Sequence, residues 1–458
     1  MKNRRKDINI MVLIFYFLIS FAKAIFLDIT SQKSICDASS LVLQGMMDYY
    51  DGSKYGGTVG MFSPPYYWWQ AGHAFGGVLD FWHNCQNDTY ESLLLDSLVA
   101  QTGRNYDYIP SNQSTTEGND DQGFWGILVM SAAERNFTSP ADQKQFPTWL
   151  TLAQAVYNTM WSRWDAEHCG GGLRWQIFSW NSGYSYKNTI SSGCLFHISA
   201  RLARFTSNDS YVQTSETIYD WLTDTGFVVD NDNYIRIYDG ANIDHDCTTI
   251  NHLEWTYNIG IILSGTAYLY NYTGENKWLE RSEKIMNHVE KFFNNSIMYE
   301  RACQPSKNCN NDQRSFRAIF SRTLGMTSIL IPALSSRIRI LLEASAQGAA
   351  MSCTGGYDGH TCGQDWSLGS WDNVYGLGEQ MAALEIFQSL INNDAPLTNE
   401  VVNVIGDYSA GLGDGSSGSY DTMNHQPIEI TKKDTIGAAF ITAFVLLALL
   451  LGSILMIF

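Results

Sequence analysis

The feature that most limits what this chain can fold into is its hydrophobic periodicity. Between about residue 30 and residue 395, apolar residues recur at helical spacing in twelve stretches, and no convincing series of alternating strands accompanies them. The pattern predicts an all-α fold with helices at residues 37–50, 68–84, 90–101, 122–136, 147–164, 188–206, 209–224, 255–272, 276–293, 314–332, 335–351 and 376–391.

Two kinds of helix alternate along this series. The odd members, such as 276–293, carry their charges on one side, which is typical of a helix with one face in solvent. The even members, such as 68–84 and 255–272, contain few charges and several glycines. Glycine costs up to ~1 kcal/mol relative to alanine inside a helix, so its repetition indicates close contact between helices. These helices are therefore predicted to be buried.

Inner and outer helices that alternate six times predict an (α/α)6 toroid of about twelve helices. The alternative is a superhelical array of helical hairpins. Repeats in such an array resemble one another in sequence, and these do not. The toroid is therefore the favoured architecture.

The loops indicate where a ligand would bind. Connections from even to odd helices are mostly short, whereas those that lead into even helices are mostly long and rich in aromatic residues, Asn, Asp and Gly. In a toroid all the long loops fall on one face, and long loops in a compact domain usually form a binding surface. Aromatic rings beside amides and carboxylates suit sugars. The residues predicted to contact a sugar are Asn119, Trp125, Trp180, Asp244, Tyr257, Asn258 and Trp371.

One of these long loops contains two adjacent aspartates, Asp120 and Asp121, directly before a helical pattern. One interpretation is a helix start, in which acids satisfy free N–H groups and the helix dipole. The other is a glycosidase pair, which needs carboxyl groups ~5 Å apart if one attacks the sugar and the other protonates the leaving oxygen. A helix N-terminus lowers the pKa of both acids, so burial and mutual repulsion would have to outweigh the dipole. The residues alone leave both interpretations open.

Other clusters of reactive residues are weaker. Asp244-His245-Asp246 has the composition of a metal or acid/base trio, but no second His/Asp group at ligand spacing accompanies it, and a role in ordering the loop is at least as well supported. The sequence contains no CxxC or His/Cys metal spacing, and no nucleophile elbow surrounds its serines. We therefore expect no metal and no cofactor.

The two ends of the chain are predicted to be processed. Residues 1–24 have a basic start, an apolar core and a small-residue cleavage site, which is the pattern of a secretory signal peptide. Residues 436–458 form a terminal apolar tail, and a Gly/Ser-containing tether precedes it at 396–435. This pattern favours a GPI-anchor signal over a retained membrane span, with Gly415 to Gly418 and Asn424 as candidate attachment sites. A catalytic domain at 25–395 would thus be held at the outer face of the plasma membrane or in the cell wall.

Charge, cysteines and sequons agree with a secreted protein that binds a neutral ligand. The formal net charge of −17 argues against nucleic acid or anionic lipid as ligand. Nine cysteines predict up to four disulfides and one free thiol, with local bridges Cys303–Cys309 and Cys353–Cys362. Predicted N-glycosylation sites are Asn87, Asn112, Asn136, Asn208, Asn271 and Asn294.

Four motifs carry a resemblance to a known family. Gly118–Trp125, Phe196–Arg204, Trp255–Gly260 and Gly378–Met381 resemble glycoside hydrolase family 76, the endo-α-1,6-mannanase family, and in particular its fungal GPI-anchored cell-wall branch. The resemblance covers roughly residues 30–395. It implies an (α/α)6 fold and retaining cleavage of an α-1,6-mannose backbone, with the first aspartate as nucleophile and the second as acid/base. The family commonly has an aromatic pair after the tandem aspartates. Here Phe124 precedes Trp125, which could alter a sugar subsite.

The resemblance also implies a biological role. It suggests a retaining mannan endo-1,6-α-mannosidase or transglycosidase in cell-wall biogenesis, which links GPI glycoproteins to wall polysaccharide. The donor would be an α-1,6-mannoside or a GPI glycan, and a β-glucan is a candidate acceptor. A catalytically inactive glycan-binding wall protein is the main alternative, and a helical scaffold for protein partners is a weaker one. Residue types do not distinguish hydrolysis from transfer, which depends on whether water or a sugar hydroxyl reaches the intermediate.

Overall fold

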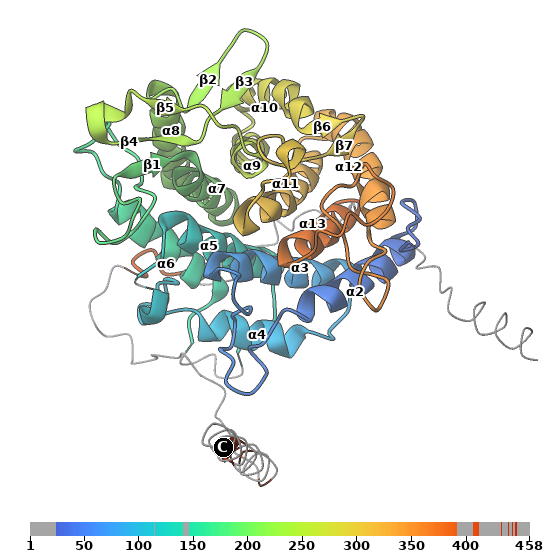
Figure 1. Ribbon diagram of the computed structural model, residues 1–458. Coiled ribbons are helices and arrows are strands. Elements are labelled where there is room, and N and C mark those ends of the chain that lie inside the picture. The colour runs from blue at the N-terminus through green and yellow to red at the C-terminus, as the bar shows by residue number, and fades with distance from the viewer. Residues whose placement is uncertain are drawn as a thin grey trace, which may run out of the picture.

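The structure, a computed structural model, describes residues 24–113, 115–140, 146–391 and 406–411 and the single residues 432, 438, 442, 445 and 446. Within these ranges twelve α-helices form two concentric rings, which Figure 1 shows from one end of the toroid. The predicted all-α, (α/α)6 architecture is confirmed. The inner ring consists of α3 (Trp68–Cys85), α5 (Asn119–Glu134), α7 (Thr189–Thr206), α9 (Thr256–Thr273), α11 (Asn311–Leu330) and α13 (Leu377–Gln388). The outer ring consists of α2 (Gln32–Met47), α4 (Glu91–Ala100), α6 (Trp149–Ser162), α8 (Asp209–Asp224), α10 (Asn276–Val289) and α12 (Pro332–Ser352).

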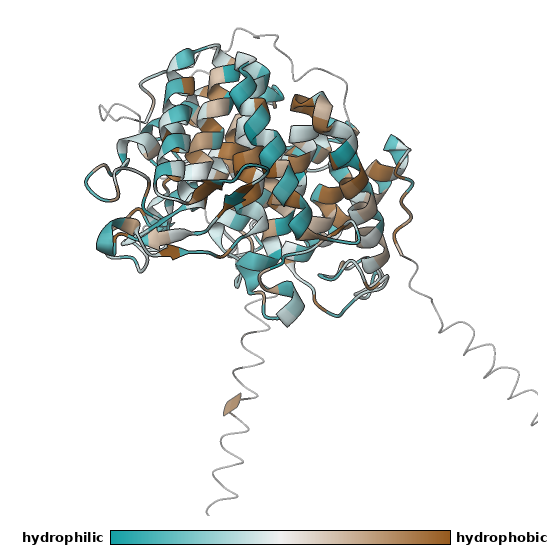
Figure 2. Ribbon diagram, turned by 90° about the horizontal axis from the view of Figure 1, so that it is seen from above, coloured by the Kyte–Doolittle hydropathy of each residue, from teal (hydrophilic) through white to brown (hydrophobic). Residues whose placement is uncertain are grey.

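The inner helices are those predicted to be buried. Each packs against the next around the ring, and α13 closes it against α3. Glycine permits this approach, because a Cβ at Gly265 of α9 would lie 2.3 Å from the Phe196 ring of α7. Hydrophobic segments lie in the middle of the helical body, and hydrophilic ones lie toward its outside and in the loops (Figure 2). The core therefore occupies the space within and between the two rings.

The helix boundaries differ from the predicted ones where local capping decides them. α2 begins at Gln32 because the Ser31 hydroxyl accepts a hydrogen bond from the backbone N–H of Ser34. α5 begins at Asn119, three residues earlier than predicted, with Gly118 as its N-cap. The earlier start places Asp120 and Asp121 in the first turn of an inner helix.

Short strands that the periodicity did not predict stiffen the loops. β1 (Tyr186–Asn188), β4 (Gly240–Asn242) and β5 (Ile250–Asn251) form an antiparallel sheet in the order β1-β4-β5. Runs of two or three residues are too short to show alternation, so no periodic pattern marks them in the sequence. The remaining short elements are β2 (Val228–Asp230) paired with β3 (Ile235–Ile237), β6 (Phe293–Asn294) paired with β7 (Ile297–Met298), and the 3-10 turns η1 (Ser111–Gln113), η2 (Asp244–Cys247), η3 (Glu290–Phe292) and η4 (Gln304–Ser306).

Four disulfides and one free cysteine match the predicted count. The local bridges Cys303–Cys309 and Cys353–Cys362 are confirmed. Two long-range bridges, Cys36–Cys85 and Cys169–Cys247, complete the set, and Cys194 is the buried free thiol.

Four predicted glycosylation sites, Asn87, Asn136, Asn208 and Asn271, lie at the inner-to-outer connections, opposite the long loops. All six sequon asparagines have side chains that are at least partly exposed. Their geometry is compatible with glycosylation, which stays a prediction.

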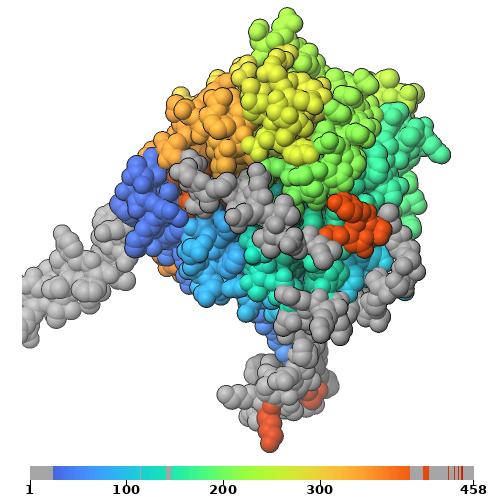
Figure 3. Space-filling view, turned by 180° about the vertical axis from the view of Figure 1, so that it is seen from behind, coloured from blue at the N-terminus to red at the C-terminus, as the bar shows by residue number. Residues whose placement is uncertain are grey.

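The described part of the predicted tether lies on the domain. Asn158 of α6 donates from Nδ2 to the carbonyl oxygens of Tyr408 and Ala410, at 2.9 and 2.8 Å. Figure 3 shows residues 406–411 as a red patch on the back of the molecule. This part of the predicted tether at 396–435 thus contacts the outer helix α6, and the predicted domain boundary near 395 stays a prediction.

The predicted signal peptide and the predicted apolar tail lie outside the described residues, apart from residue 24 and four single residues of the tail. In the described part of the chain, no helix is both long enough and apolar enough to cross a membrane.

Candidate active site

The long loops surround a cavity at the end of the toroid where the inner helices begin. Its volume is about 660 Å³. The first turns of α3, α5, α9 and α11 line it, together with the loop that follows residue 174. Both aspartates of the tandem pair are among the lining residues. The predicted binding face and the predicted catalytic pair therefore coincide.

The first turn of α5 fixes the two carboxylates in different ways. The backbone N–H of Gly118 donates to Oδ2 of Asp121 at 2.6 Å. The Trp175 indole donates from Nε1 to Oδ2 of Asp120 at 3.0 Å. The other oxygen of Asp120, Oδ1, has no hydrogen-bond partner among the described residues. Asp120 is thus held by one oxygen, while its second oxygen, Oδ1, is buried without a partner.

Gly118 is required by close contacts around this pair. A Cβ at this position would lie 2.3 Å from Oδ1 of Asp120, 2.9 Å from the Trp175 carbonyl oxygen and 3.2 Å from Oδ2 of Asp121. Its φ of −97° is accessible to any residue. The need for glycine here is therefore steric and not conformational.

The surroundings raise the pKa of both carboxyl groups. Burial is the main cause for each. For Asp120, backbone N–H groups of the helix start and the Trp175 indole oppose the increase. For Asp121, the negative charge of Asp120 adds to burial and raises the pKa well above its ordinary value. Burial thus outweighs the helix dipole, and Asp121 is the group that retains a proton while Asp120 ionises.

Two further acids that sequence reasoning missed line the same cavity. Asp312 at the start of α11 accepts a hydrogen bond from Trp69 Nε1 at 2.9 Å. Asp239 accepts from the Tyr186 hydroxyl at 2.7 Å and from Asn251 Nδ2 at 3.1 Å. Burial raises the pKa of both groups. Neither has a sequence signal, because each is an isolated acid that the closure of the ring brings to the site.

Glu117 is the third acid that sequence reasoning did not identify. Its side chain is 1 % exposed, and neither carboxyl oxygen has a hydrogen-bond partner in the part of the chain that the structure describes. Burial, and then the charge of Asp121, raise its pKa well above the ordinary value. This group is therefore expected to be uncharged beside the catalytic pair.

The predicted aromatic contacts are only partly correct. Tyr257 lines the cavity, and its ring stacks on Phe316 with the centroids 3.8 Å apart. Trp125 is fully buried between Trp68 and Tyr108, so its predicted contact with a sugar is wrong in this structure. Consecutive residues of a helix point to different faces, so Phe124 lines the cavity while Trp125 packs against these two rings.

Trp180 and Trp371 also lie outside the cavity lining. Trp180 is 68 % exposed and stacks on Phe178, while Trp371 packs 6.0 Å from Tyr375, measured between ring centroids. Trp175 instead presents an exposed ring beside the pair. It had no distinguishing signal in the sequence.

The predicted polar contacts need correction too. Asn119 is buried. Its Nδ2 donates to the Arg174 carbonyl oxygen at 2.8 Å, and its Oδ1 accepts from Arg163 Nε at 2.8 Å. Both ends of its amide are therefore hydrogen-bonded within the protein. Asn258 is 1 % exposed, lies outside the cavity lining, and helps to lower the pKa of Asp239 against the effect of burial. Both are supports for the site and do not face a ligand.

The Asp244-His245-Asp246 cluster lies away from the cavity. Asp244 is exposed in η2, and the carboxylate of Asp246 accepts a hydrogen bond from the backbone N–H of Cys169 at 2.7 Å. A role in ordering the loop therefore replaces the predicted contact of Asp244 with a sugar. Among the described residues, no group of three or more His, Cys, Asp or Glu side chains is placed to hold a metal ion.

The chain has relatives at both the sequence and the structural level. The profile of glycosyl hydrolase family 76 matches residues 34–400. The mannan endo-1,6-α-mannosidase DFG5 of Saccharomyces cerevisiae is 55% identical over 437 residues, with 94% of each chain covered. The protein of the same name from Candida albicans is 53% identical over 443 residues, with 94% of this chain and 95% of that one covered.

Solved structures share the fold. Dfg5 from Chaetomium thermophilum, crystallised in complex with glucosamine, is 35% identical and superposes with a TM-score of 0.79, covering 85% of this chain and 98% of that chain. An inactive variant of an α-1,6-mannanase from a Salegentibacter species, in complex with α-1,6-mannotriose, has a TM-score of 0.61 at 17% identity, with 78% and 98% covered. At that identity the second comparison speaks for the toroidal fold alone.

Proposed function

This chain belongs to glycosyl hydrolase family 76, and from that premise we propose that it is a retaining mannan endo-1,6-α-mannosidase or transglycosidase. The observation that carries the proposal is the pair of carboxyl groups on the cavity floor, with Asp120 held by Trp175 and Asp121 kept protonated by burial and by the charge of its neighbour. Relatives that are more than half identical in sequence bear the name of this activity.

In the proposed reaction Asp120 is the nucleophile and Asp121 the acid/base. A carboxylate oxygen of Asp120 bonds to the anomeric carbon while Asp121 gives its proton to the departing glycosidic oxygen. In the second step Asp121 takes a proton from water or from an acceptor hydroxyl. The oxygen of that molecule then bonds to the anomeric carbon as Asp120 leaves as a carboxylate. The same two residues thus serve hydrolysis and transfer.

The experiment compares two amide variants on an activated mannoside and on an α-1,6-mannan. Asp120→Asn should lower turnover on both substrates by about a thousandfold or more, because an amide is a poor nucleophile. Asp121→Asn should spare the first step on the activated donor, whose leaving group needs no proton.

Both amide variants should keep their thermal stability, because asparagine still satisfies a helix start. Normal turnover by Asp120→Asn would contradict the catalytic role and leave the pair as a helix start. A glycan-binding protein without activity is the second candidate. It is disfavoured because two buried acids with raised pKa values are costly to maintain for binding alone.

The biological setting is part of the proposal. We infer that the donor is an α-1,6-mannoside or a GPI glycan, that a β-glucan hydroxyl can serve as acceptor, and that a GPI anchor holds the enzyme at the outer face of the plasma membrane or in the wall. Support comes from the cavity volume of about 660 Å³ and the sequence pattern of residues 396–458. Product analysis with an α-1,6-mannan donor, with and without β-glucan, distinguishes hydrolysis from transfer.

A further inference from the structure

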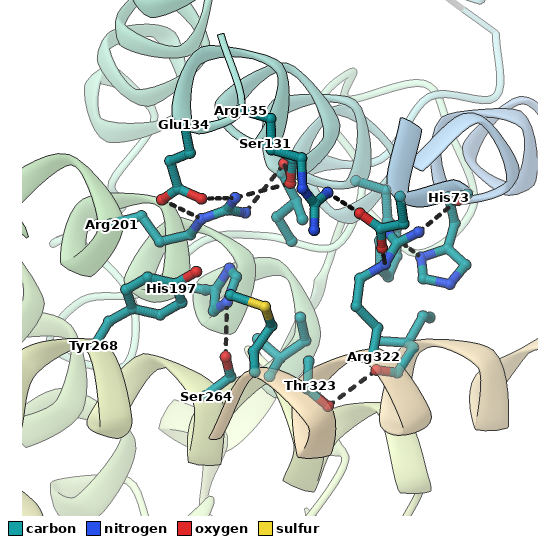
Figure 4. Close-up of a pocket in the computed structure, with 16 residues that line it drawn as sticks. His73, Ser131, Glu134, Arg135, His197, Arg201, Ser264, Tyr268, Arg322 and Thr323 are labelled. Carbon is teal, nitrogen blue, oxygen red and sulfur yellow. Dashed lines mark hydrogen bonds and ion pairs between the residues drawn. The ribbon is translucent and has the colours of Figure 1, made fainter. Parts of the chain in front are cut away.

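A second, smaller cavity lies on the axis of the toroid beneath the active site. Its volume is about 30 Å³. Its walls come from α3, α5, α7, α9 and α11, in the part of each helix that follows the turn facing the sugar-binding cavity. Figure 4 shows polar side chains that point into it from opposite helices. We call this the axial chamber. Its labelled lining residues are His73, Ser131, Glu134, Arg135, His197, Arg201, Ser264, Tyr268, Arg322 and Thr323.

Ion pairs compensate the charges of the axial chamber. Arg201 Nη2 lies 2.7 Å from Glu134 Oε2. Arg322 Nε lies 3.1 Å from Asp80 Oδ2, and Arg135 pairs with the same aspartate. Arg322 also donates to Glu385 of α13 at 3.1 Å. Three guanidinium groups thus face three carboxylates, and the network gives no charged ligand an advantage.

Two histidines leave polar atoms in the chamber unsatisfied. His73 and His197 are 3 % and 4 % exposed. Nε2 of His73 and Nδ1 of His197 have no hydrogen-bond partner among the described residues. Burial and the neighbouring arginines lower the pKa of both rings well below the ordinary value. The rings are therefore neutral. Nε2 of His73 lies 3.8 Å from Oε1 of Glu385, so Nδ1 of His197 is the nitrogen that is left for an uncharged hydrogen-bonding molecule.

Water is the ligand that fits these dimensions. About 10–15 Å³ is enough for one water molecule, provided that two to four polar groups surround it. A chamber of about 30 Å³ exceeds that volume, and hydroxyl, imidazole and ionic groups line it. It has both the space and the partners for one or two ordered waters.

Phe124 separates the axial chamber from the active site. It is the one described residue that lines both cavities. Its ring is 3 % exposed, lies 4.8 Å from the Trp69 ring of the active site, and lies 6.3 Å from the His73 ring of the chamber, measured between centroids. It also lies one helical turn after Asp120 and Asp121. A single apolar side chain thus stands between the polar chamber and the reacting groups.

We propose that the axial chamber is a hydrated compartment and that Phe124 keeps its water from the glycosyl-enzyme intermediate. The proposal rests on the proposed function, because it concerns the second step at Asp120. Water that passes Phe124 could reach the side of the anomeric carbon that the departing sugar has left, which is the side opposite Asp120. Water arriving there would bond through its oxygen to that carbon and give a proton to Asp121, while Asp120 leaves as a carboxylate. Exclusion of water by Phe124 favours the acceptor hydroxyl, which undergoes the same exchange.

The test measures how the intermediate divides between water and an added acceptor. With an activated α-mannoside donor and an α-1,6-mannobiose acceptor, the ratio of free mannose to transfer product is determined for wild type, Phe124→Ala and Phe124→Leu. This ratio does not depend on the amount of folded enzyme, so it separates the proposed role from a loss of stability. We expect hydrolysis to gain about tenfold over transfer in Phe124→Ala and less in Phe124→Leu.

Ile127→Ala is the matched control. Ile127 lines the chamber on the same helix but does not line the active site. This variant enlarges the chamber and leaves Phe124 in place, so the ratio should stay at the wild-type value. An unchanged ratio in active Phe124→Ala, or an equal shift in Ile127→Ala, would overturn the proposal. No turnover of the donor by wild type would instead overturn the proposed function.

A high-resolution crystal structure of the wild-type protein tests the hydration directly. Ordered water bonded to His197 Nδ1 is the expected result. A chamber without ordered water would overturn the first half of the proposal, whatever the kinetic outcome.

Discussion

The indole of Trp175 is the residue-scale feature that separates the roles of the two aspartates. Its hydrogen bond to Asp120 lowers the pKa of that carboxyl, against the effect of burial. At Asp121 the hydrogen bond that lowers the pKa comes from the backbone N–H of Gly118 and not from a side chain. The negative charge of Asp120 raises the pKa of Asp121, because it destabilises the Asp121 anion. Two neighbouring carboxyl groups in one helical turn thus acquire different protonation preferences.

Removal of this hydrogen bond by Trp175→Phe should raise the pKa of Asp120. Because Asp120 must be ionised to attack, the acidic limb of the profile of kcat/KM against pH should move to higher pH. A hydrogen bond to a charged group contributes ~1.5–3 kcal/mol, so kcat/KM should also fall by about tenfold or more. Trp180→Phe, which changes an exposed indole outside the cavity, is the control. If the limb stays in place in Trp175→Phe, this indole does not tune Asp120.

Gly118→Ala tests the steric requirement at the start of α5. The new methyl group would meet Asp120 Oδ1 at 2.3 Å and must displace that carboxylate. A shift of about 1 Å in a reacting group can cost about a hundredfold in rate. We expect kcat to fall by about that factor while the melting temperature changes little, because the backbone conformation suits alanine. Normal turnover would mean that the helix start relaxes around the methyl group.

At the scale of elements, the N-terminal turns of the inner helices line the candidate active site, and the later turns line the axial chamber. The first turns carry the reacting groups, and the following turns of α3, α5, α7 and α11 hold the buried ion pairs and histidines of the axial chamber. These ion pairs cross between helices and fix the register of the ring. They also bury two neutral histidines, which makes the stability of the ring sensitive to acid.

His197 allows this sensitivity of stability to acid to be measured. Burial, Arg201 and Arg322 lower its pKa well below the ordinary value of 6.5. Below pH ~6.5 this histidine is therefore protonated in the unfolded chain and neutral in the folded chain. Its contribution should lower the free energy of unfolding by up to ~1.4 kcal/mol for each unit by which the pH falls. His197→Gln should reduce the loss of stability between pH 7.5 and pH 5, measured by urea unfolding.

His245→Gln is the control for this experiment, because His245 is exposed in η2. Its replacement should leave the loss of stability in acid as it is in wild type. An unaltered dependence on pH in His197→Gln would show that His197 is protonated in the folded protein.

At the scale of the whole molecule, one end of the toroid carries the cavity and the other carries the short connections from inner to outer helices. The long loops surround the cavity, while four sequons lie at the opposite connections. Residues 406–411 lie along α6, where glycine allows close approach: a Cβ at Gly406 would be 2.4 Å from Gln154 Oε1. Residues 406–411 thus lie on the outer wall of the domain and not at the cavity.

The proposed anchor gives the prediction at this scale. Phosphatidylinositol-specific phospholipase C should release the mature protein from membranes, because a GPI anchor ends in a phosphoinositide that the enzyme cleaves. The released protein should lack residues 436–458 by mass spectrometry. Protein that stays in the membrane pellet and retains those residues would instead favour a retained span.

The sequence by itself determined the class of fold and identified the tandem aspartates as the candidate catalytic pair. Twelve helical stretches with alternating glycine-rich and charged members sufficed for the toroid, because the apolar pattern of each helix shows which of its faces is buried. The tandem aspartates in the first turn of α5 were found for the same reason, since they are adjacent in the sequence. The two local disulfides were also readable from the short separation of their cysteines.

Only the tertiary structure decided which side chains meet in the cavity. Asp239, Asp312 and Trp175 come from three distant parts of the chain, and no local pattern relates their positions. Trp125 was misassigned because its burial depends on packing against Trp68 of another helix and against Tyr108 of a loop. The protonation of the pair also depended on burial by residues far along the chain. Contacts of this kind form when the ring of helices closes, because closure brings together residues that are far apart in the chain. A local hydrophobic pattern carries no information about such contacts.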